Sequence, residues 1–199
     1  MYLDVMTHGS LAELFGKAAL QVHPRHTATH LQRKWLQALP AVQRFAVQGA
    51  RLMSHSYRNF HVGAAAYCHC SRTGEFGIVN SGNIKLWEGS PKFCAEMTLL
   101  GMIDPDRYDR IIGFAVYGEQ IQPDPSGLRP RTLHPCPVCR GLMRKDPRIA
   151  QWTRMFTFRS WMIGDDPEEQ RKKYVREHMS FRELLHAHAN GNGNGNHEH

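Results

Sequence analysis

Two short stretches, far apart in the chain, carry three of its five cysteines. The first reads Cys94-Ala95-Glu96. The second, Pro135-Cys136-Pro137-Val138-Cys139, has the Cys-x-x-Cys spacing with which two thiolates at the start of a helix face one metal ion. Three protein ligands leave the fourth position of a zinc ion open for water, and an unligated carboxylate beside that position can move protons. The chain is therefore expected to fold so that these two stretches meet.

Four stretches in the same order resemble the cytidine deaminase family. That family has His or Cys followed by Ala-Glu, and later Pro-Cys-x-x-Cys. The other similar stretches are the family's Phe-x-Val-Gly-Ala-Ala strand, its Gly-x-Asn sugar-binding loop and its C-terminal Glu-Leu-Leu segment, found here as Phe60-His61-Val62-Gly63-Ala64-Ala65, Gly82-Asn83-Ile84 and Phe181-Arg182-Glu183-Leu184-Leu185. The resemblance covers about residues 40 to 187. With Cys94 in the first ligand position, the chain looks like the three-cysteine branch, which is usually homotetrameric.

The resemblance implies a three-layer α/β/α fold, with a mixed sheet of about five strands and helices on both faces. It implies one Zn²⁺ held by Cys94, Cys136 and Cys139, and attack of water on C4 of a cytosine-type ring. Glu96 would take a proton from the water, deliver one to N3 and help to protonate the departing amine. The expected activity is hydrolytic deamination of cytidine, deoxycytidine or a close analogue to the uracil form, as in pyrimidine salvage.

The resemblance also implies roles for residues around the metal. Phe60 would pack against the base, although a place in the ordinary core is equally open. The backbone at Ala95 would meet the carbonyl of the base, and Asn83 would bond a sugar hydroxyl.

Three thiolates give the zinc core a net charge of minus one, which calls for a positive group nearby. The family commonly has Arg directly after the catalytic Glu, whereas this chain has Met97. Arg140, next to Cys139, is the leading substitute, and the alternative is an exposed helix residue.

Lys85 is the informative departure from the family, which typically has Asn-x-Glu with the Glu accepting from the ribose. An ammonium group cannot replace that acceptor. Either Lys85 points away, toward Glu88 for example, or the ligand carries an anion or a different sugar. The loop 83–91 looks more like that of blasticidin S deaminase. A modified cytosine nucleoside or nucleotide with an anionic group at Lys85 is therefore the alternative substrate.

The net charge of +7 leaves nucleic acid as a further hypothesis. A polynucleotide cytosine deaminase is less favoured, because the first ligand is Cys and no extra RNA-binding motif follows. A zinc-stabilised structural protein without catalysis is disfavoured by Glu96. The expected partners are a small nucleoside substrate and further copies of the chain, as a dimer or tetramer, rather than nucleic acid or membrane.

The 199 residues, 41% of them hydrophobic, suit one domain with a substantial core. The chain has no run of eighteen apolar residues and no signal-peptide pattern, and its cysteines suit a reducing compartment, so we expect a cytoplasmic protein. We expect an N-terminal extension with a short helix over 1–37, the deaminase domain over 38–188 and a disordered Asn/Gly/His tail over 189–199.

Periodicity and breakers predict the elements of the domain. Helices are expected over 40–55, 94–102, 136–145 and 181–188, and strands over 62–70, 76–79, 111–117 and 154–160. Loops are expected over 80–89, rich in Gly and Asn, and over 119–134, rich in proline. We expect the second loop to shape the pocket.

Overall fold

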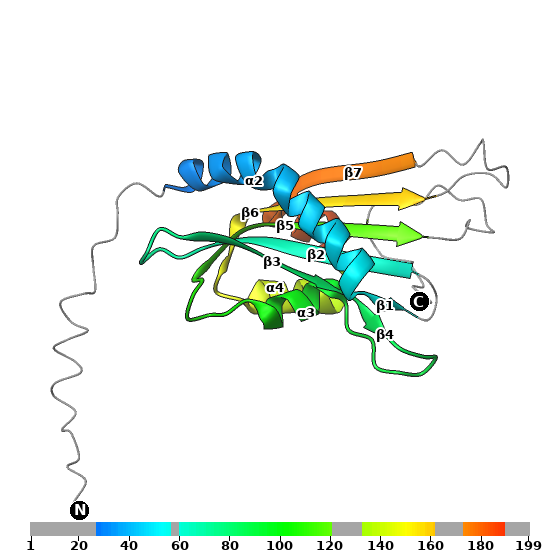
Figure 1. Cartoon of the computed structure of the whole chain (residues 1–199). Coiled ribbons are helices and arrows are strands. Elements are labelled where there is room, and N and C mark those ends of the chain that lie inside the picture. The colour runs from blue at the N-terminus through cyan, green and yellow to red at the C-terminus, as the bar shows by residue number, and fades with distance from the viewer. Residues whose placement is uncertain (1–26, 57–59, 121–132, 162–172, 190–199) are drawn as a thin grey trace, which may run out of the picture.

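The computed structural model describes residues 27–56, 60–120, 133–161 and 173–189 (Figure 1). Its helices are α2 (Ala28–Gln48), the π-helical turn η1 (Gly49–Met53), α3 (Ala95–Met102), α4 (Pro137–Lys145) and α5 (Phe181–Ala189). Its strands are β1 (His55–Ser56), β2 (Phe60–His69), β3 (Phe76–Gly82), β4 (Ile84–Lys85), β5 (Arg110–Gln120), β6 (Ile149–Trp161) and β7 (Lys173–Ser180). No helix in these ranges is both long and apolar enough to cross a membrane.

The main sheet has five strands in the order β3-β2-β5-β6-β7. Strands β5 and β6 run parallel, and the other three pairs are antiparallel. The expected mixed sheet of about five strands is confirmed. Strands β1 and β4 form a separate, short parallel pair, which joins residues before β2 to residues after β3.

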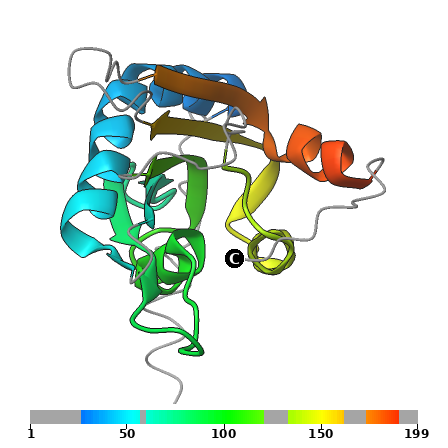
Figure 2. The same cartoon turned by 90° about the vertical axis from the view of Figure 1, so that its right-hand side faces the viewer.

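Helices cover both faces of the sheet, as the alternation along β2 dictates. Ala64 and Ala66 belong to one buried cluster, whereas Ala65 and Tyr67 belong to the other. The first cluster includes Leu99 of α3, Met143 of α4 and Leu184 of α5, and the second includes Leu31 and Trp35 of α2. Figure 2 shows α2 on one side of the sheet and α3 and α4 on the other. The three-layer α/β/α architecture is therefore confirmed.

Helix α2 lies directly on β2 because the strand has a glycine at the crossing. A Cβ atom at Gly63 would lie 2.0 Å from the carbonyl oxygen of Ala46 and 2.3 Å from the backbone nitrogen of Ala50. Both of these atoms belong to the backbone, so no side-chain rotation could relieve the contact. The close approach holds the start of β2, which begins at Phe60, against the helix layer.

The first helix begins at Ala28, twelve residues before the predicted start, and the prediction of 40–55 was wrong at both ends. The side chain of Thr27 caps the helix by accepting from the N–H of His30. Pro40, taken as the start, lies inside the helix, where it removes one backbone bond without ending it. Figure 1 shows that α2 changes direction along its length, as helices do at proline. Residues after Gln48 continue as η1.

Other boundaries differ for a common reason, which is that paired strands extend past their hydrophobic runs. Strand β3 continues to Gly82 and β4 follows within the predicted loop 80–89, so the loop prediction was wrong over those positions. Strand β6 begins at Ile149, before the predicted 154. Strand β7, with its mixed charged and apolar residues, was not predicted.

The division of the chain into an extension, a domain and a tail remains a prediction. Helix α2 passes through the expected boundary at 37, and α5 includes Ala189. The helix expected before residue 27, most of the proline-rich loop and the tail from 190 lie outside the described residues.

Candidate metal centre and active site

The three cysteines meet where two helices begin. Cys94 is the N-cap residue of α3, Cys136 is the N-cap residue of α4, and Cys139 lies in the first turn of α4. Their sulfur atoms all lie within 4.8 Å of one another, and those of Cys94 and Cys136 are 3.7 Å apart. Tetrahedral bonds of about 2.3 Å to zinc would separate two sulfurs by roughly 3.8 Å. The three side chains therefore fit one metal ion.

The electrostatics of this cluster favour a cation. The N–H of Cys139 donates to Cys136 Sγ at 3.5 Å, and the positive ends of two helices converge on the sulfurs. Hydrogen bonds from Cys139 and then Cys94 lower the pKa of Cys136 below that of a free thiol. The hydrogen bond from the Cys139 thiol to Cys136 raises the pKa of Cys139. A metal ion would allow all three sulfurs to ionise together. Nowhere else in the described ranges do three metal-ligating side chains come together.

Glu96 lies in the first turn of α3, two residues after Cys94, and its side chain is only 5% exposed. Burial raises the pKa of Glu96 to about 7; the nearby Cys136 sulfur also raises it, and Lys92 lowers it. The start of the helix is fixed to β3, because Ser81 Oγ donates to the carbonyl oxygen of Ala95 at 2.6 Å. A carboxyl with a pKa near neutrality can both accept and release a proton.

The side chain of Asn83 makes three hydrogen bonds within the protein. Its Oδ1 accepts from the N–H of Val62 at 2.8 Å and from the hydroxyl of Ser54, and its Nδ2 donates to the carbonyl of Phe60 at 3.2 Å. The Ser54 hydroxyl also contacts Nδ1 of His61 at 3.0 Å. Asn83 therefore holds the start of β2 beside the segment that leads to Cys94.

Phe60 is half-buried at the start of β2, on the face of the sheet that carries α3 and α4. The guanidinium carbon of Arg159, on β6, lies 5.2 Å from the centroid of its ring, within the range of a cation–π interaction. Between these strands Gly118 leaves room for Leu133, because a Cβ at Gly118 would lie 2.0 Å from Cδ1 of Leu133 but at an ordinary contact distance, 3.5 Å, from the ring of Phe60. The ring is thus held by a cation instead of being enclosed in the apolar core.

Comparison with solved structures shows which fold carries these residues. A cytidine deaminase from Burkholderia pseudomallei matches with a TM-score of 0.50 and 21% sequence identity, over 73% of this chain and 94% of that chain. The chain has the cytidine deaminase fold. A cytidine deaminase from Mycobacterium leprae matches with a TM-score of 0.45 and 18% identity, over 74% of this chain and 96% of that one. No protein-family model matches the sequence, and no curated protein does either.

Within the cytidine deaminase fold, the two basic candidates take different positions. Lys85 is half-buried in β4, where it pairs with Ser56 of β1. Backbone bonds between Ile84 and Phe93, at 2.9 and 3.0 Å, connect this short strand to the residue just before Cys94. Arg140 donates from Nη1 to the carbonyl oxygen of Pro135 at 2.6 Å, which holds the turn that enters Cys136.

Several residues that support the site were not predicted from the sequence. Ser54 and Ser81 are buried hydroxyls that fix the backbone, and neither stands in a motif that distinguishes it from any other serine. His134 Nε2 lies 2.5 Å from Glu177 Oε2, so the residue two before Cys136 is joined to β7. Only the adjacency of His134 to the Pro-Cys motif could have drawn attention to this pair.

Proposed function

We propose that the chain is a zinc-dependent hydrolytic deaminase that converts a cytosine nucleoside, such as cytidine or deoxycytidine, to the uracil form and ammonia. The observation that carries the proposal is that buried Glu96 lies in the first turn of the helix capped by Cys94, one of three convergent sulfur ligands, in a cytidine deaminase fold. Three thiolates in tetrahedral spacing are a donor set typical of zinc. When bound, the ion would supply an activated water and Lewis acidity in its open position.

Glu96 does the proton transfers. Its carboxylate takes one proton from the attacking water and passes it to N3 of the ring. It then takes the second proton from the hydroxyl now bonded to C4 and gives it to the amine, which leaves as ammonia while the C4 carbonyl forms. Burial favours both the uptake and the release of protons by Glu96, because a carboxyl with a pKa raised to about 7 exchanges its proton near neutral pH. Ser81, by fixing the carbonyl of Ala95, keeps the carboxyl aimed in one direction.

The same end of the sheet holds the substrate. The ring of Phe60 packs against the base, and the N–H of Ala95, at the start of α3, meets the carbonyl of the base. The Nδ2 of Asn83 has two hydrogens, of which one bonds Phe60, and the second donates to a sugar hydroxyl. The positive charge of Arg140 offsets the negative charge of the three thiolates. Its bond to the carbonyl of Pro135 keeps the guanidinium beside the turn that enters Cys136.

A second candidate substrate, a modified cytosine nucleoside or a nucleotide such as a monophosphate or blasticidin S, is favoured by Lys85. A cation on β4 stands where an acceptor for the ribose would be needed, so an anionic group on the ligand would suit it better. We further propose that the protein assembles with copies of itself, as a dimer or tetramer, and acts in the cytoplasm in pyrimidine salvage.

Replacing Glu96 by glutamine tests the catalytic role. Glu96→Gln is expected to keep its zinc and lose at least about 100-fold in turnover, because the amide cannot take a proton. Glu88→Gln, an exposed position on the rim, is the matched control and should stay near wild type. Turnover retained in Glu96→Gln would contradict the assignment.

A substrate panel separates the candidates. Ammonia release is measured with cytidine, deoxycytidine, their monophosphates, blasticidin S and single-stranded DNA. Reaction with plain nucleosides supports the first proposal, and reaction with the monophosphates or the antibiotic alone supports the second. In the second case Lys85→Glu should shift the preference toward cytidine. Reaction with DNA alone, or with none of the panel, would overturn both.

A further inference from the structure

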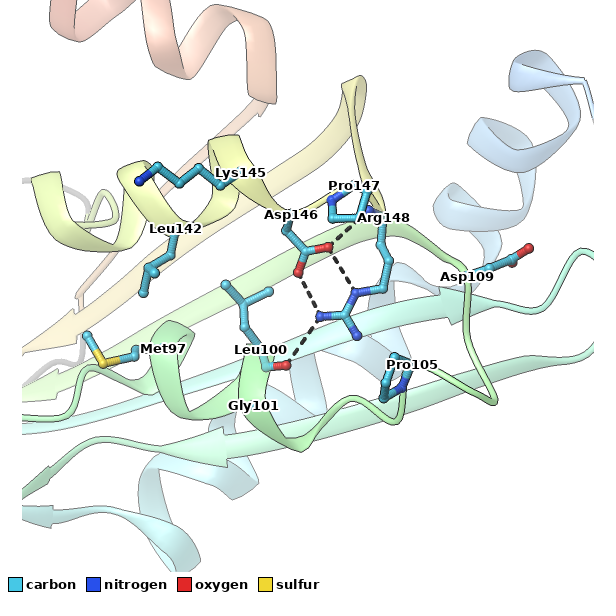
Figure 3. A pocket seen from close by; sticks show the side chains of 10 residues that line it. All are labelled: Met97, Leu100, Gly101, Pro105, Asp109, Leu142, Lys145, Asp146, Pro147 and Arg148. Carbon is cyan, nitrogen blue, oxygen red and sulfur yellow. Dashed lines mark hydrogen bonds and ion pairs between the residues drawn. The ribbon is translucent and has the colours of Figure 1, made fainter.

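The helices that carry the metal ligands are joined at both ends. At their N-terminal ends, the caps Cys94 and Cys136 bring their sulfurs together. At their C-terminal ends they are joined by the side chain of Arg148, which follows α4 in the turn before β6 (Figure 3). The proposed function uses the first junction and gives no role to the second.

The guanidinium of Arg148 bonds both helices. Its Nε and Nη2 donate to the two carboxylate oxygens of Asp146, the C-cap of α4, at 2.9 and 2.7 Å. Its Nη1 donates to the carbonyl of Ile103, the C-cap of α3, at 2.9 Å, and Nη2 also donates to the carbonyl of Leu100 at 3.3 Å. The side chains of Arg148 and Asp146 are only 14% and 11% exposed. One planar group thus spans the two helix ends.

The chemistry of this junction is specific to arginine. The last carbonyls of a helix have no partners within it and carry partial negative charge, so a cation there is favourable. A guanidinium can offer one edge to a carboxylate and the other to two carbonyls, whereas an ammonium is a point charge without that fork. Lysine could therefore replace only part of the junction.

Side-chain packing does not fill the space between the helices at this end. An open surface depression of about 720 Å³ lies there, lined by Met97 and Leu100 of α3, by Leu142 and Lys145 of α4, and by Arg148 itself (Figure 3). The guanidinium therefore bridges a gap. Because the depression is open to solvent, water can enter it and bond the carbonyls of Leu100 and Ile103 if Arg148 is replaced, so a variant is expected to fold.

We propose that Arg148 is a positioning residue that sets how the two metal-bearing helices lie relative to each other. Helix α3 has 8 residues and is about 12 Å long, so a shift of about 1 Å at its C-terminal end turns it by roughly 5°. Because the helix pivots at its N-terminal end, such a turn changes the directions in which the side chains of Cys94 and Glu96 leave the backbone relative to Cys136 and Cys139. The effect on the metal needs only the three-cysteine site, whereas the effect on turnover rests on the proposed function.

The test compares Arg148→Met with Arg144→Met, an exposed arginine in the last turn of α4. Zinc dissociation constants are measured by chelator competition, and unfolding is measured with and without zinc. We expect Arg148→Met to bind zinc about tenfold more weakly, which lowers the stabilisation by zinc by about 1.4 kcal/mol. Arg148→Lys should fall between Arg148→Met and wild type, and Arg144→Met should match wild type.

The proposal would be overturned if Arg148→Met destabilised the metal-free and the zinc-loaded protein equally and left the zinc affinity unchanged. A residue that only stabilises the fold, without positioning the metal ligands, would give that result. If Arg148→Met fails to fold, Asp146→Asn provides the second test. It keeps the bonds to Leu100 and Ile103 but weakens the hold on α4, so it should raise the zinc dissociation constant by a smaller factor. An unchanged constant would again overturn the proposal.

The outcome is separable from the proposed function. A wild-type protein that deaminates nothing in the panel, combined with zinc loss in Arg148→Met, would leave the positioning role standing and remove the enzyme. Deamination by the wild type, with zinc affinity unchanged in Arg148→Met, would leave the proposed enzyme standing and remove the positioning role of Arg148.

Discussion

Replacing Asn83 by alanine removes three hydrogen bonds at a position that is only 7% exposed. A buried polar group left without a partner costs about 1–3 kcal/mol. The Ser54 hydroxyl keeps its contact with His61, and the half-buried backbone at Phe60 and Val62 can bond water in part. We therefore expect Asn83→Ala to lower the free energy of unfolding by about 2–4 kcal/mol, which corresponds to a fall in Tm on the order of 10 °C.

Urea unfolding followed by circular dichroism measures this change, and Asn80→Ala is the matched control. Asn80 makes a single side-chain bond, from Nδ2 to the carbonyl of Phe45 at 3.1 Å, and should cost about 1 kcal/mol or less. An Asn83→Ala protein within about 0.5 kcal/mol of wild type would refute the reasoning. If such a protein had also lost activity, Asn83 would act on the ligand alone.

Three further predictions concern packing and pH. Gly63→Ala should destabilise by about 3 kcal/mol or more in urea unfolding, because its Cβ would meet backbone at 2.0 Å, whereas Gly101→Ala has open space and should not destabilise. Burial alone would raise the pKa of Asp146, but bonds from Arg148 outweigh it and hold the pKa below its usual range. As pH falls, Asp146 therefore binds its proton at a higher pH in the unfolded chain than in the folded one, so the free energy of unfolding should fall below about pH 4. Asp146→Asn should make that fall less steep, and an unchanged pH profile in this variant would contradict the prediction. Burial also lowers the pKa of His178, whose Nε2 accepts from Trp35 Nε1 at 3.1 Å, so stability should fall as pH drops below about 6.5 in wild type but not in His178→Gln.

The three-cysteine cluster could be predicted from the sequence because its spacing is local. Cys-x-x-Cys at the start of a helix fixes two ligands by spacing alone, and Glu96 follows Cys94 within one turn of a second helix. What brings the two helices together is the order of strands, which no local pattern specifies. The resemblance to a known family supplied a mixed sheet of about five strands with helices on both faces, which the structure confirms, whereas the strand order itself was not predicted.

The supporting contacts could not be predicted, because they join residues remote in sequence. Asn83 stands in a stretch that resembles a family sugar-binding loop, yet its bonds to Val62 and Ser54 depend on how β2 lies beside it. Arg148 looks like an ordinary turn residue until the carbonyls of α3 are placed next to it. Pro40 misled the helix boundary because tertiary packing of Trp35 and Leu31 outweighs the cost of one lost backbone bond.

Zinc analysis combined with X-ray absorption at the zinc edge tests the central claim most directly. The account predicts one zinc ion per chain, with three sulfur neighbours at about 2.3 Å and one lighter atom. A Cys94→Ser variant keeps the histidines of the tail, so it should lose this signal if the cysteines are the ligands. Protein without stoichiometric zinc, or zinc bound mainly by nitrogen and retained in Cys94→Ser, would contradict the account.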